Sequence, residues 1–221
     1  NHPLGRPILG TKETVESFNA ELLRDYFKNV YTAKNLIVSA VGNLEHERVR
    51  ELVEEKFGSL VQPGEPALDQ APRVVPKILV RNKELEQSHL CLGVGSYPQN
   101  HDDRYSSYVL NTLLGGSMSS RLFQNVREKR GLAYAVFSGL SAYRDAGSFT
   151  VYAGCSNEAV GEVIDLIVEE LRGVKQTAVP EVELQRSKDH LKGSLMLSLE
   201  NTASRMSHLA RQEIYFERHF G

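Results

Sequence analysis

The fold of this 221-residue chain is constrained most strongly by the order of the predicted elements in the second half of the sequence. Two stretches suited to β-strands, residues 134–143 and 148–156, flank a short connection at residues 144–147, which is typical of a hairpin. Three helical patterns follow, over residues 160–171, 180–199 and 203–216. Because paired strands come first and helices gather later, we predict an α+β fold, an antiparallel β-sheet with helices packed on one face.

Two further strands and two further helices are predicted before this hairpin. Residues 78–80 form a short apolar run, and residues 89–94 alternate between large apolar and other side chains, as a strand with one covered face does. The two helices are expected to end at Leu114 and at Gly131, where glycine interrupts the pattern. These elements belong to the same predicted sheet and its helical cover.

The first 60 residues predict a helix, a strand and a second helix. Apolar side chains recur at helical spacing over residues 15–30, and Thr11 or Thr14 is expected to cap this helix. An apolar β-run at residues 35–43 and an amphipathic helix at residues 49–57 follow. This set is too small to bury a sheet alone.

A proline-rich stretch divides the chain. Residues 62–76 hold four prolines and a glycine without any periodicity, so we interpret them as an interdomain linker in extended conformation. The predicted domains are therefore residues 1–61 and residues 77–221. A long surface loop inside one domain is the alternative.

Composition excludes several classes of partner. The formal net charge is −2 with no extended run of one sign, so nucleic acid and anionic lipid are not expected partners. No apolar run approaches the roughly 18 residues of a membrane helix, and we expect a soluble protein, cytoplasmic or periplasmic if bacterial. The two cysteines, Cys91 and Cys155, lack metal-type spacing and are interpreted as buried small hydrophobes.

Residues 119–136 combine a polar helix, a turn at Gly131 and an apolar strand. Arg127 on the helix and Tyr134 at the strand start are therefore expected to lie close together. Both side chains donate hydrogen bonds, and preorganised donors aimed at a developing oxyanion lower the barrier to peptide hydrolysis by roughly 3 kcal/mol each. The alternative is structural: Arg127 pairs with Glu128, and Tyr134 is only a half-buried strand residue.

These 18 residues read SSRLFQNVREKRGLAYAV, and LLGG at residues 113–116 precedes them. The pattern closely resembles the C-terminal-half signature of the pitrilysin, insulin-degrading and mitochondrial-processing-peptidase family of zinc peptidases. The resemblance covers nearly the whole chain, as a slice from the middle of a roughly two-domain protein. It implies that residues 1–61 are the helix-strand-helix end of the first, zinc-binding domain, and that residues 77–221 are a second domain truncated before its last helix and strand.

The resemblance also implies roles for individual residues. Arg127 would bind the backbone carbonyl of a peptide substrate, and Tyr134 would stabilise the oxyanion beside it. Gly115 and Gly116 would match a glycine-rich loop that contributes to substrate access between the two halves. A plain helix-breaking turn is the alternative for this glycine pair.

The chain itself does not offer the family's zinc ligands. The inverted motif His-x-x-Glu-His is absent from the sequence, and a catalytic zinc needs three protein ligands in a tight geometry. The seven histidines are widely scattered, at positions 2, 46, 89, 101, 190, 208 and 219. We therefore predict no metal site in this chain, whereas the resemblance implies zinc in the full-length protein.

The sequence thus predicts the substrate-binding C-terminal half of a zinc-dependent endopeptidase that hydrolyses unfolded peptides, inactive as an isolated chain. The alternative is a non-catalytic partner subunit of a processing-peptidase-like complex. The implied partners are peptide substrates, the missing zinc-binding first domain and a second subunit in a homodimer or heterodimer. We also expect residues 36–41 to pair with the open edge of the second domain's sheet, within one chain or by exchange between chains.

Overall fold

The computed structural model describes residues 2–60 and 70–220, which form two compact units. One unit comprises Asn1–Pro72 together with Leu199–Gly221, and the other comprises Arg73–Ser198.

The domain division expected from the sequence stays a prediction. Part of the proposed linker, residues 61–69, lies outside the described residues. Its described remainder, residues 70–76, contains no helix or strand.

A three-stranded antiparallel sheet forms the centre of the unit Arg73–Ser198. Its strands are β1 (Ser88–Ser96), β2 (Ala133–Ala142) and β3 (Gly147–Cys155), in the spatial order β1-β3-β2. The hairpin between β2 and β3 is closed by a hydrogen bond from the Tyr143 amide to the Ala146 carbonyl, 2.8 Å long. The predicted hairpin is confirmed, and β3 is the central strand.

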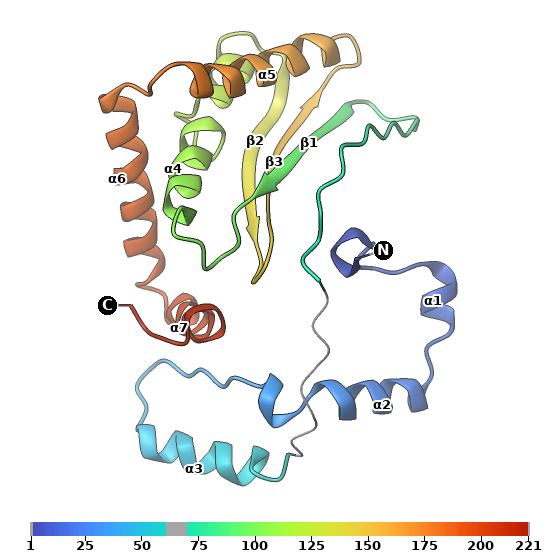
Figure 1. Ribbon diagram of the computed structural model, residues 1–221, viewed down its shortest axis with the longest axis vertical. Coiled ribbons are helices and arrows are strands. Elements are labelled where there is room, and N and C mark those ends of the chain that lie inside the picture. The colour runs from blue at the N-terminus through green and yellow to red at the C-terminus, as the bar shows by residue number, and fades with distance from the viewer. Residues whose placement is uncertain (1, 61–69, 221) are drawn as a thin grey trace. The chain divides into compact units, whose positions relative to one another are not determined.

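Helices cover one face of this sheet (Figure 1). The unit contains α4 (Arg104–Leu114), η3 (Phe123–Glu128), α5 (Val160–Gln176) and α6 (Glu181–Ser198). Of these, α4 and η3 contact β2, α5 contacts β3, and α6 packs against α4. The predicted α+β fold, an antiparallel sheet with helices on one face, is confirmed.

The core lies between the sheet and these helices, and strand alternation explains it. Val151 and Ala153 of β3 are fully buried, whereas Tyr152 between them faces the opposite side of the sheet. The buried apolar side chains from the helices belong to α4, α5 and the segment around η3: Leu113, Leu114, Leu122, Val126, Val163, Leu166 and Ile167. No helix of this unit lies against the other face of the sheet in Figure 1.

The other unit is mainly helical. Its elements are η1 (Pro3–Gly5), α1 (Lys12–Glu16), α2 (Ala20–Val30), η2 (Ala33–Asn35), α3 (His46–Phe57) and α7 (Thr202–Phe216). The predicted helix over residues 15–30 is interrupted, because Asn19 starts a new helix by accepting a hydrogen bond from the Leu22 amide, 2.9 Å long. No helix among the described residues is long and apolar enough to cross a membrane.

Two predicted strands are wrong. Residues 35–43 and residues 78–80 form no strand, although both runs are apolar. A strand needs a partner for its backbone groups, and neither run has one among the described residues. Ile78 and Val80 are 91% and 78% exposed.

The predicted pairing of residues 36–41 with a sheet edge within one chain is also wrong, because the sheet contains only β1, β3 and β2 among the described residues. Pairing by exchange between chains stays a prediction. These residues lie in the other unit, where the Ser39 hydroxyl donates to the Met206 carbonyl of α7 at 2.9 Å. Residues 36–41 thus contact α7 through a side-chain hydrogen bond and not through backbone pairing with a strand.

The two cysteines differ from each other. Cys155 is 2% exposed at the end of β3, and burial raises the pKa of its thiol. Cys91 is exposed, so its interpretation as a buried hydrophobe is wrong. It pairs with Tyr152 in the sheet register and therefore belongs to the face that the helices leave uncovered.

Replacing Leu122 by alanine tests the described core. Leu122 is fully buried, so the Leu122→Ala variant should lose about 2–5 kcal/mol of unfolding free energy through lost burial and the cavity left behind. Urea unfolding followed by circular dichroism measures this loss. The control Leu197→Ala, at a side chain 68% exposed on α6, should change stability by less than about 0.5 kcal/mol.

Candidate functional site

The helix that carries Arg127 is wound more widely than an α-helix. After Arg121 and Leu122 it continues as the π-helix η3, and the Lys129 amide donates to the Gln124 carbonyl at 3.0 Å, a five-residue step. Such a turn accommodates one residue more than an α-helical turn would. Widened turns of this kind are frequent at functional sites.

Gly131 ends this helix and redirects the chain into β2. Its φ of 62° lies in the left-handed region, which glycine adopts without a Cβ penalty. The Gly131 amide donates to the Arg127 carbonyl and the Leu132 amide donates to the Val126 carbonyl, both at 3.0 Å. The last helical carbonyls are therefore satisfied immediately before β2 begins.

Tyr134 occupies an irregular position in β2. Ala133 pairs with Cys155 and Ala135 pairs with Gly154, so Tyr134 is an extra residue without a partner in the register, as in a β-bulge. Its side chain is 77% exposed, whereas Ala133 is buried against the core. The irregularity thus directs the phenol away from the helix-covered face.

The structure brings Arg127 and Tyr134 together. The Arg127 guanidinium carbon lies 5.5 Å from the centroid of the Tyr134 ring and 4.8 Å from that of Phe123. Cation–π contacts of this kind hold a guanidinium between two rings. Glu128 lies 3.7 Å from Arg127 Nε, but with side chains 40% and 50% exposed this ion pair contributes little.

Both groups keep hydrogen-bonding capacity. Among the described residues, neither the Arg127 guanidinium nor the Tyr134 hydroxyl has a hydrogen-bond acceptor or donor within the protein. An exposed pair of donors on neighbouring elements can bind one carbonyl or carboxylate oxygen of a ligand. The structural alternative, in which Arg127 pairs with Glu128, coexists with this arrangement because the pair is loose and open to water.

Polar contacts hold the helix of Arg127 in place. The Arg121 guanidinium donates two hydrogen bonds to the Glu183 carboxylate of α6, 2.7 and 2.6 Å long. The Asn125 amide donates to the Glu170 carboxylate of α5. The Arg121 guanidinium holds the pKa of Glu183 below its ordinary value, mainly through these hydrogen bonds. The helix is thus attached to both neighbouring helices.

The glycine pair has a packing role at its first position. A Cβ on Gly115 would lie 2.4 Å from the Ser138 amide nitrogen, and the Gly115 carbonyl accepts a hydrogen bond from that amide at 3.1 Å. Gly115 is buried and Gly116 is exposed. The part of these glycines in substrate binding stays a prediction.

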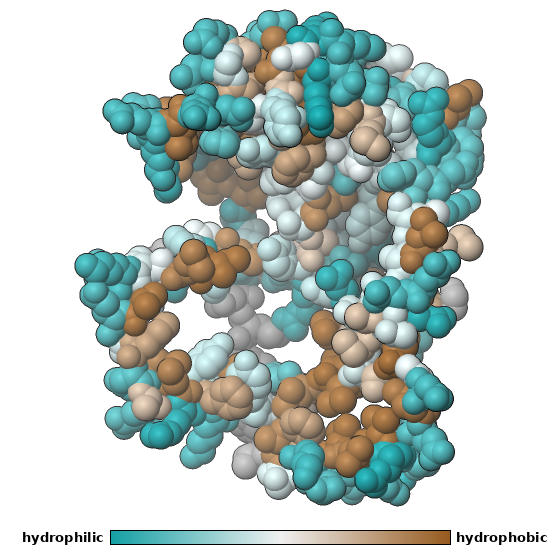
Figure 2. Space-filling model, turned by 180° about the vertical axis from the view of Figure 1, so that it is seen from behind, coloured by the Kyte–Doolittle hydropathy of each residue, from teal (hydrophilic) through white to brown (hydrophobic). Residues whose placement is uncertain are grey.

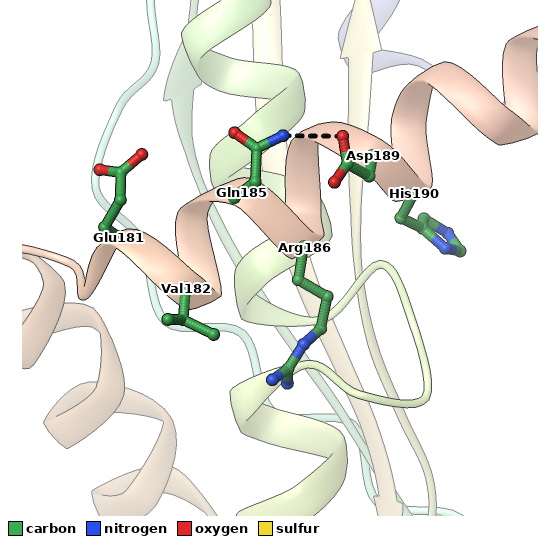
Figure 3. Close-up of a pocket in the computed structure, with 6 residues that line it drawn as sticks. All are labelled: Glu181, Val182, Gln185, Arg186, Asp189 and His190. Carbon is green, nitrogen blue, oxygen red and sulfur yellow. Dashed lines mark hydrogen bonds between the residues drawn. The ribbon is translucent and has the colours of Figure 1, made fainter.

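A separate concave surface follows α6 (Figure 3). Its lining residues are Glu181, Val182, Gln185, Arg186, Asp189 and His190. Gln185 and Asp189 share a hydrogen bond of 2.8 Å, and Figure 3 shows Arg186 extending away from this pair. Because all six residues come from one helix, this surface lacks the opposing groups that a catalytic site needs.

The described residues do not fit a zinc site. No group of three or more His, Cys, Asp or Glu side chains within residues 2–60 and 70–220 is arranged to hold a metal ion. His208 hydrogen-bonds Gln212, and His219 lies 3.6 Å from Glu213. These side chains have partners of a kind that surface histidines commonly have.

Residues 17–191 match the model of a family described as the peptidase M16 inactive domain. The chain belongs to this family, which confirms the family predicted from residues 113–136. The comparison does not assign roles to Arg127 or Tyr134.

Curated relatives of this chain are named as zinc proteases. The chain is 43% identical over 219 residues to the uncharacterized zinc protease YmxG of Bacillus subtilis, covering 99% of this chain and 53% of that protein. It is 38% identical over 222 residues to the uncharacterized zinc protease SCO5738 of Streptomyces coelicolor, covering 97% and 48%. The chain therefore spans about half the length of the curated relatives it matches.

Solved structures share the fold at lower identity. A protease from Helicobacter pylori superposes with a TM-score of 0.80 at 24% identity, covering 94% of this chain and 52% of that one. A chain of complex III2 from Candida albicans, with Inz-5 bound, gives 0.86 at 19%, covering 99% and 54%. The peptidase M16 inactive domain from Pseudomonas fluorescens gives 0.75 at 21%, covering 97% and 52%.

Sequence reasoning missed part of the site. Phe123 lies four residues before Arg127, a spacing that places both on one helix face and could have identified the ring under the guanidinium. The widened helix and the bulge at Tyr134 have no such local signal. Both depend on how the helix and the strand pack against the sheet.

The ion pair that anchors the helix of Arg127 should make stability pH-dependent. The folded-state pKa of Glu183 is lowered from 4.5, so its contribution is present above that value and is lost as the pH falls through the folded-state pKa. The Glu183→Gln variant should lose about 1–3 kcal/mol at neutral pH and show a smaller loss on acidification. Urea unfolding between about pH 7 and pH 3 measures both effects.

The matched control is Glu47→Gln. Glu47 pairs with Arg50 on α3 with side chains 68% and 65% exposed, so its removal should leave the pH profile unchanged. Equal profiles for the wild type and Glu183→Gln would contradict the proposed anchoring.

Proposed function

We propose that this chain is the substrate-binding half of a zinc-dependent endopeptidase, with Arg127 and Tyr134 as its contribution to peptide-bond hydrolysis. The observation that carries the proposal is the exposed guanidinium beside the exposed phenol, 5.5 Å from guanidinium carbon to ring centroid. Relatives over 99% of the chain are named zinc proteases, which supports the same class. Substrates would be unfolded peptides.

The two side chains suit a reaction in which a carbonyl oxygen gains negative charge. Arg127 remains protonated at any relevant pH, and the hydroxyl of Tyr134 donates a neutral hydrogen bond. Arg127 would hold a backbone carbonyl of the substrate, while Tyr134 would donate to the oxyanion as it forms. Donors already held in position by η3 and the bulge need little rearrangement, and this preorganisation lowers the barrier.

The zinc would be bound outside this chain, because the described residues offer no ligand cluster. The proposal therefore requires a zinc-binding first domain in the full-length protein. A homodimer or heterodimer of such proteins is part of the same proposal. Zinc binding and the activation of water at the zinc would be carried out by residues of that first domain.

The alternative function is a non-catalytic partner subunit. The matched family is described as an inactive domain, and the sequence lacks the inverted zinc motif, so both observations are compatible with it. The paired donors favour the peptidase, because a purely structural subunit would not need an exposed phenol on a strand irregularity. A His-x-x-Glu-His motif encoded ahead of Asn1 would decide for the peptidase, and its absence for the partner subunit.

Substitution of the donors tests the proposal in the full-length protein. Tyr134→Phe should lower kcat for a quenched fluorescent peptide by about 100- to 1,000-fold, because it removes one oxyanion donor and little else. Arg127→Ala should lower kcat/KM by a similar factor. The controls are Tyr143→Phe and Arg144→Ala, at the opposite end of β2, which should retain wild-type kinetics. Wild-type turnover by Tyr134→Phe would contradict the assigned role.

The isolated chain should be inactive. Because no zinc ligands are grouped in the part of the chain that the structure describes, the 221 residues with added zinc should not hydrolyse the same peptide. Peptide cleavage is followed by fluorescence and mass spectrometry. Hydrolysis by the isolated chain that is abolished by a chelator would refute the division of roles between the two halves.

A further inference from the structure

The sheet face that the helices leave uncovered carries a group of aromatic side chains. Tyr152 of β3 and Phe137 of β2 are register partners, and their rings stack with centroids 5.0 Å apart. Phe137 is 51% exposed. Large apolar rings on an open sheet face need a reason, because burial would be worth about 2–3 kcal/mol for a ring of this size.

Tyr152 is held in one orientation. Its hydroxyl lies 2.8 Å from His89 Nδ1 of β1, and both side chains belong to the uncovered face. The hydroxyl also lies over Gly154, since a Cβ at that position would be 3.3 Å from it. The ring therefore extends along β3 from Phe137 toward Gly154.

This direction leads to the donor pair. Gly154 is the register partner of Ala135, the residue next to Tyr134. The aromatic ledge, defined as Phe137 and Tyr152, is thus separated from Tyr134 along this face by the register pair of Ala135 and Gly154. A chain whose carbonyl meets Tyr134 would place a neighbouring side chain over the ledge.

The protein already places an apolar side chain on this face. At the other end of β1, a Cβ on Gly95 would lie 3.5 Å from a methyl group of Val74. Gly95 pairs with Ser148 of β3 and so belongs to the uncovered face. Val74, in a segment of this unit without helix or strand, thus lies against the open sheet face.

We infer that Phe137 and Tyr152 form a subsite for an aromatic or large aliphatic side chain of an extended peptide, adjacent to the carbonyl bound at Arg127 and Tyr134. This inference rests on the proposed function and adds a substrate class to it. Phe137 and Tyr152 contact the substrate side chain, and His89 is a positioning residue that acts through the Tyr152 hydroxyl. Stacked or edge-on ring contacts give such a site its preference for aromatic side chains.

The test measures binding without hydrolysis. Two fluorescein-labelled decapeptides, identical except for Phe or Ala at one position, are titrated against the full-length protein in chelator, and the position is moved through the three residues on either side of the cleaved bond. Wild type should bind the Phe peptide roughly tenfold more tightly at one position. Phe137→Ala and Tyr152→Ala should each reduce that preference to less than about twofold.

Three controls separate the ledge from general effects. Tyr105→Ala, at an exposed ring of α4 on the helix side, should keep the preference. His89→Ala should weaken the preference, and His89→Gln, which can still bond the Tyr152 hydroxyl, should restore it. Tyr134→Phe should lower turnover and leave the preference intact.

The outcomes are distinguishable from those for the proposed function. No Phe preference in wild type, or a preference that survives Phe137→Ala and Tyr152→Ala, overturns the subsite. A ledge-dependent preference in a protein whose turnover ignores Tyr134→Phe keeps the subsite and overturns the oxyanion role.

Discussion

The contact between η3 and β2 determines the whole candidate site, because each element carries one of its two donors. Leu122 and Val126 are completely buried on one side of the helix, and Arg127, one residue further round the helix, is left partly exposed. Gly131 then sets a short path into β2, leaving only a few residues between the guanidinium and the phenol. The buried side chains that stabilise the core therefore also determine the geometry of the candidate site.

The two faces of the sheet differ in burial. Its helix-covered face buries side chains such as Val151 and Ala153, and its open face presents Tyr152 and Phe137. Strand alternation makes the two sets independent, since neighbouring residues point to opposite faces. A unit built this way can change what it binds without repacking its interior. In the helical unit, by contrast, many large apolar side chains are exposed on the surface (Figure 2).

Elements whose partners lie nearby in the sequence were predictable. The β2–β3 hairpin and a helix over residues 160–171, observed as Val160–Gln176, follow from local periodicity, and Gly131 was recognised as a helix end. The apolar runs at residues 35–43 and 78–80 read as strands, but strand formation depends on a pairing edge that a single run does not reveal. The proximity of Arg127 and Tyr134 was predictable from sequence spacing. Their orientation was not, because it arises from the widened helix and the bulge.

Both donors sit at one-residue departures from regular secondary structure, one in a helix and one in a strand. Deleting a residue between Phe123 and Arg127 would reduce their spacing from four residues to three and change the contact between ring and guanidinium. A deletion at the bulge would move Tyr134 to the buried side of the sheet. Length variation at these two points would therefore separate the guanidinium from the phenol while the buried scaffold persists.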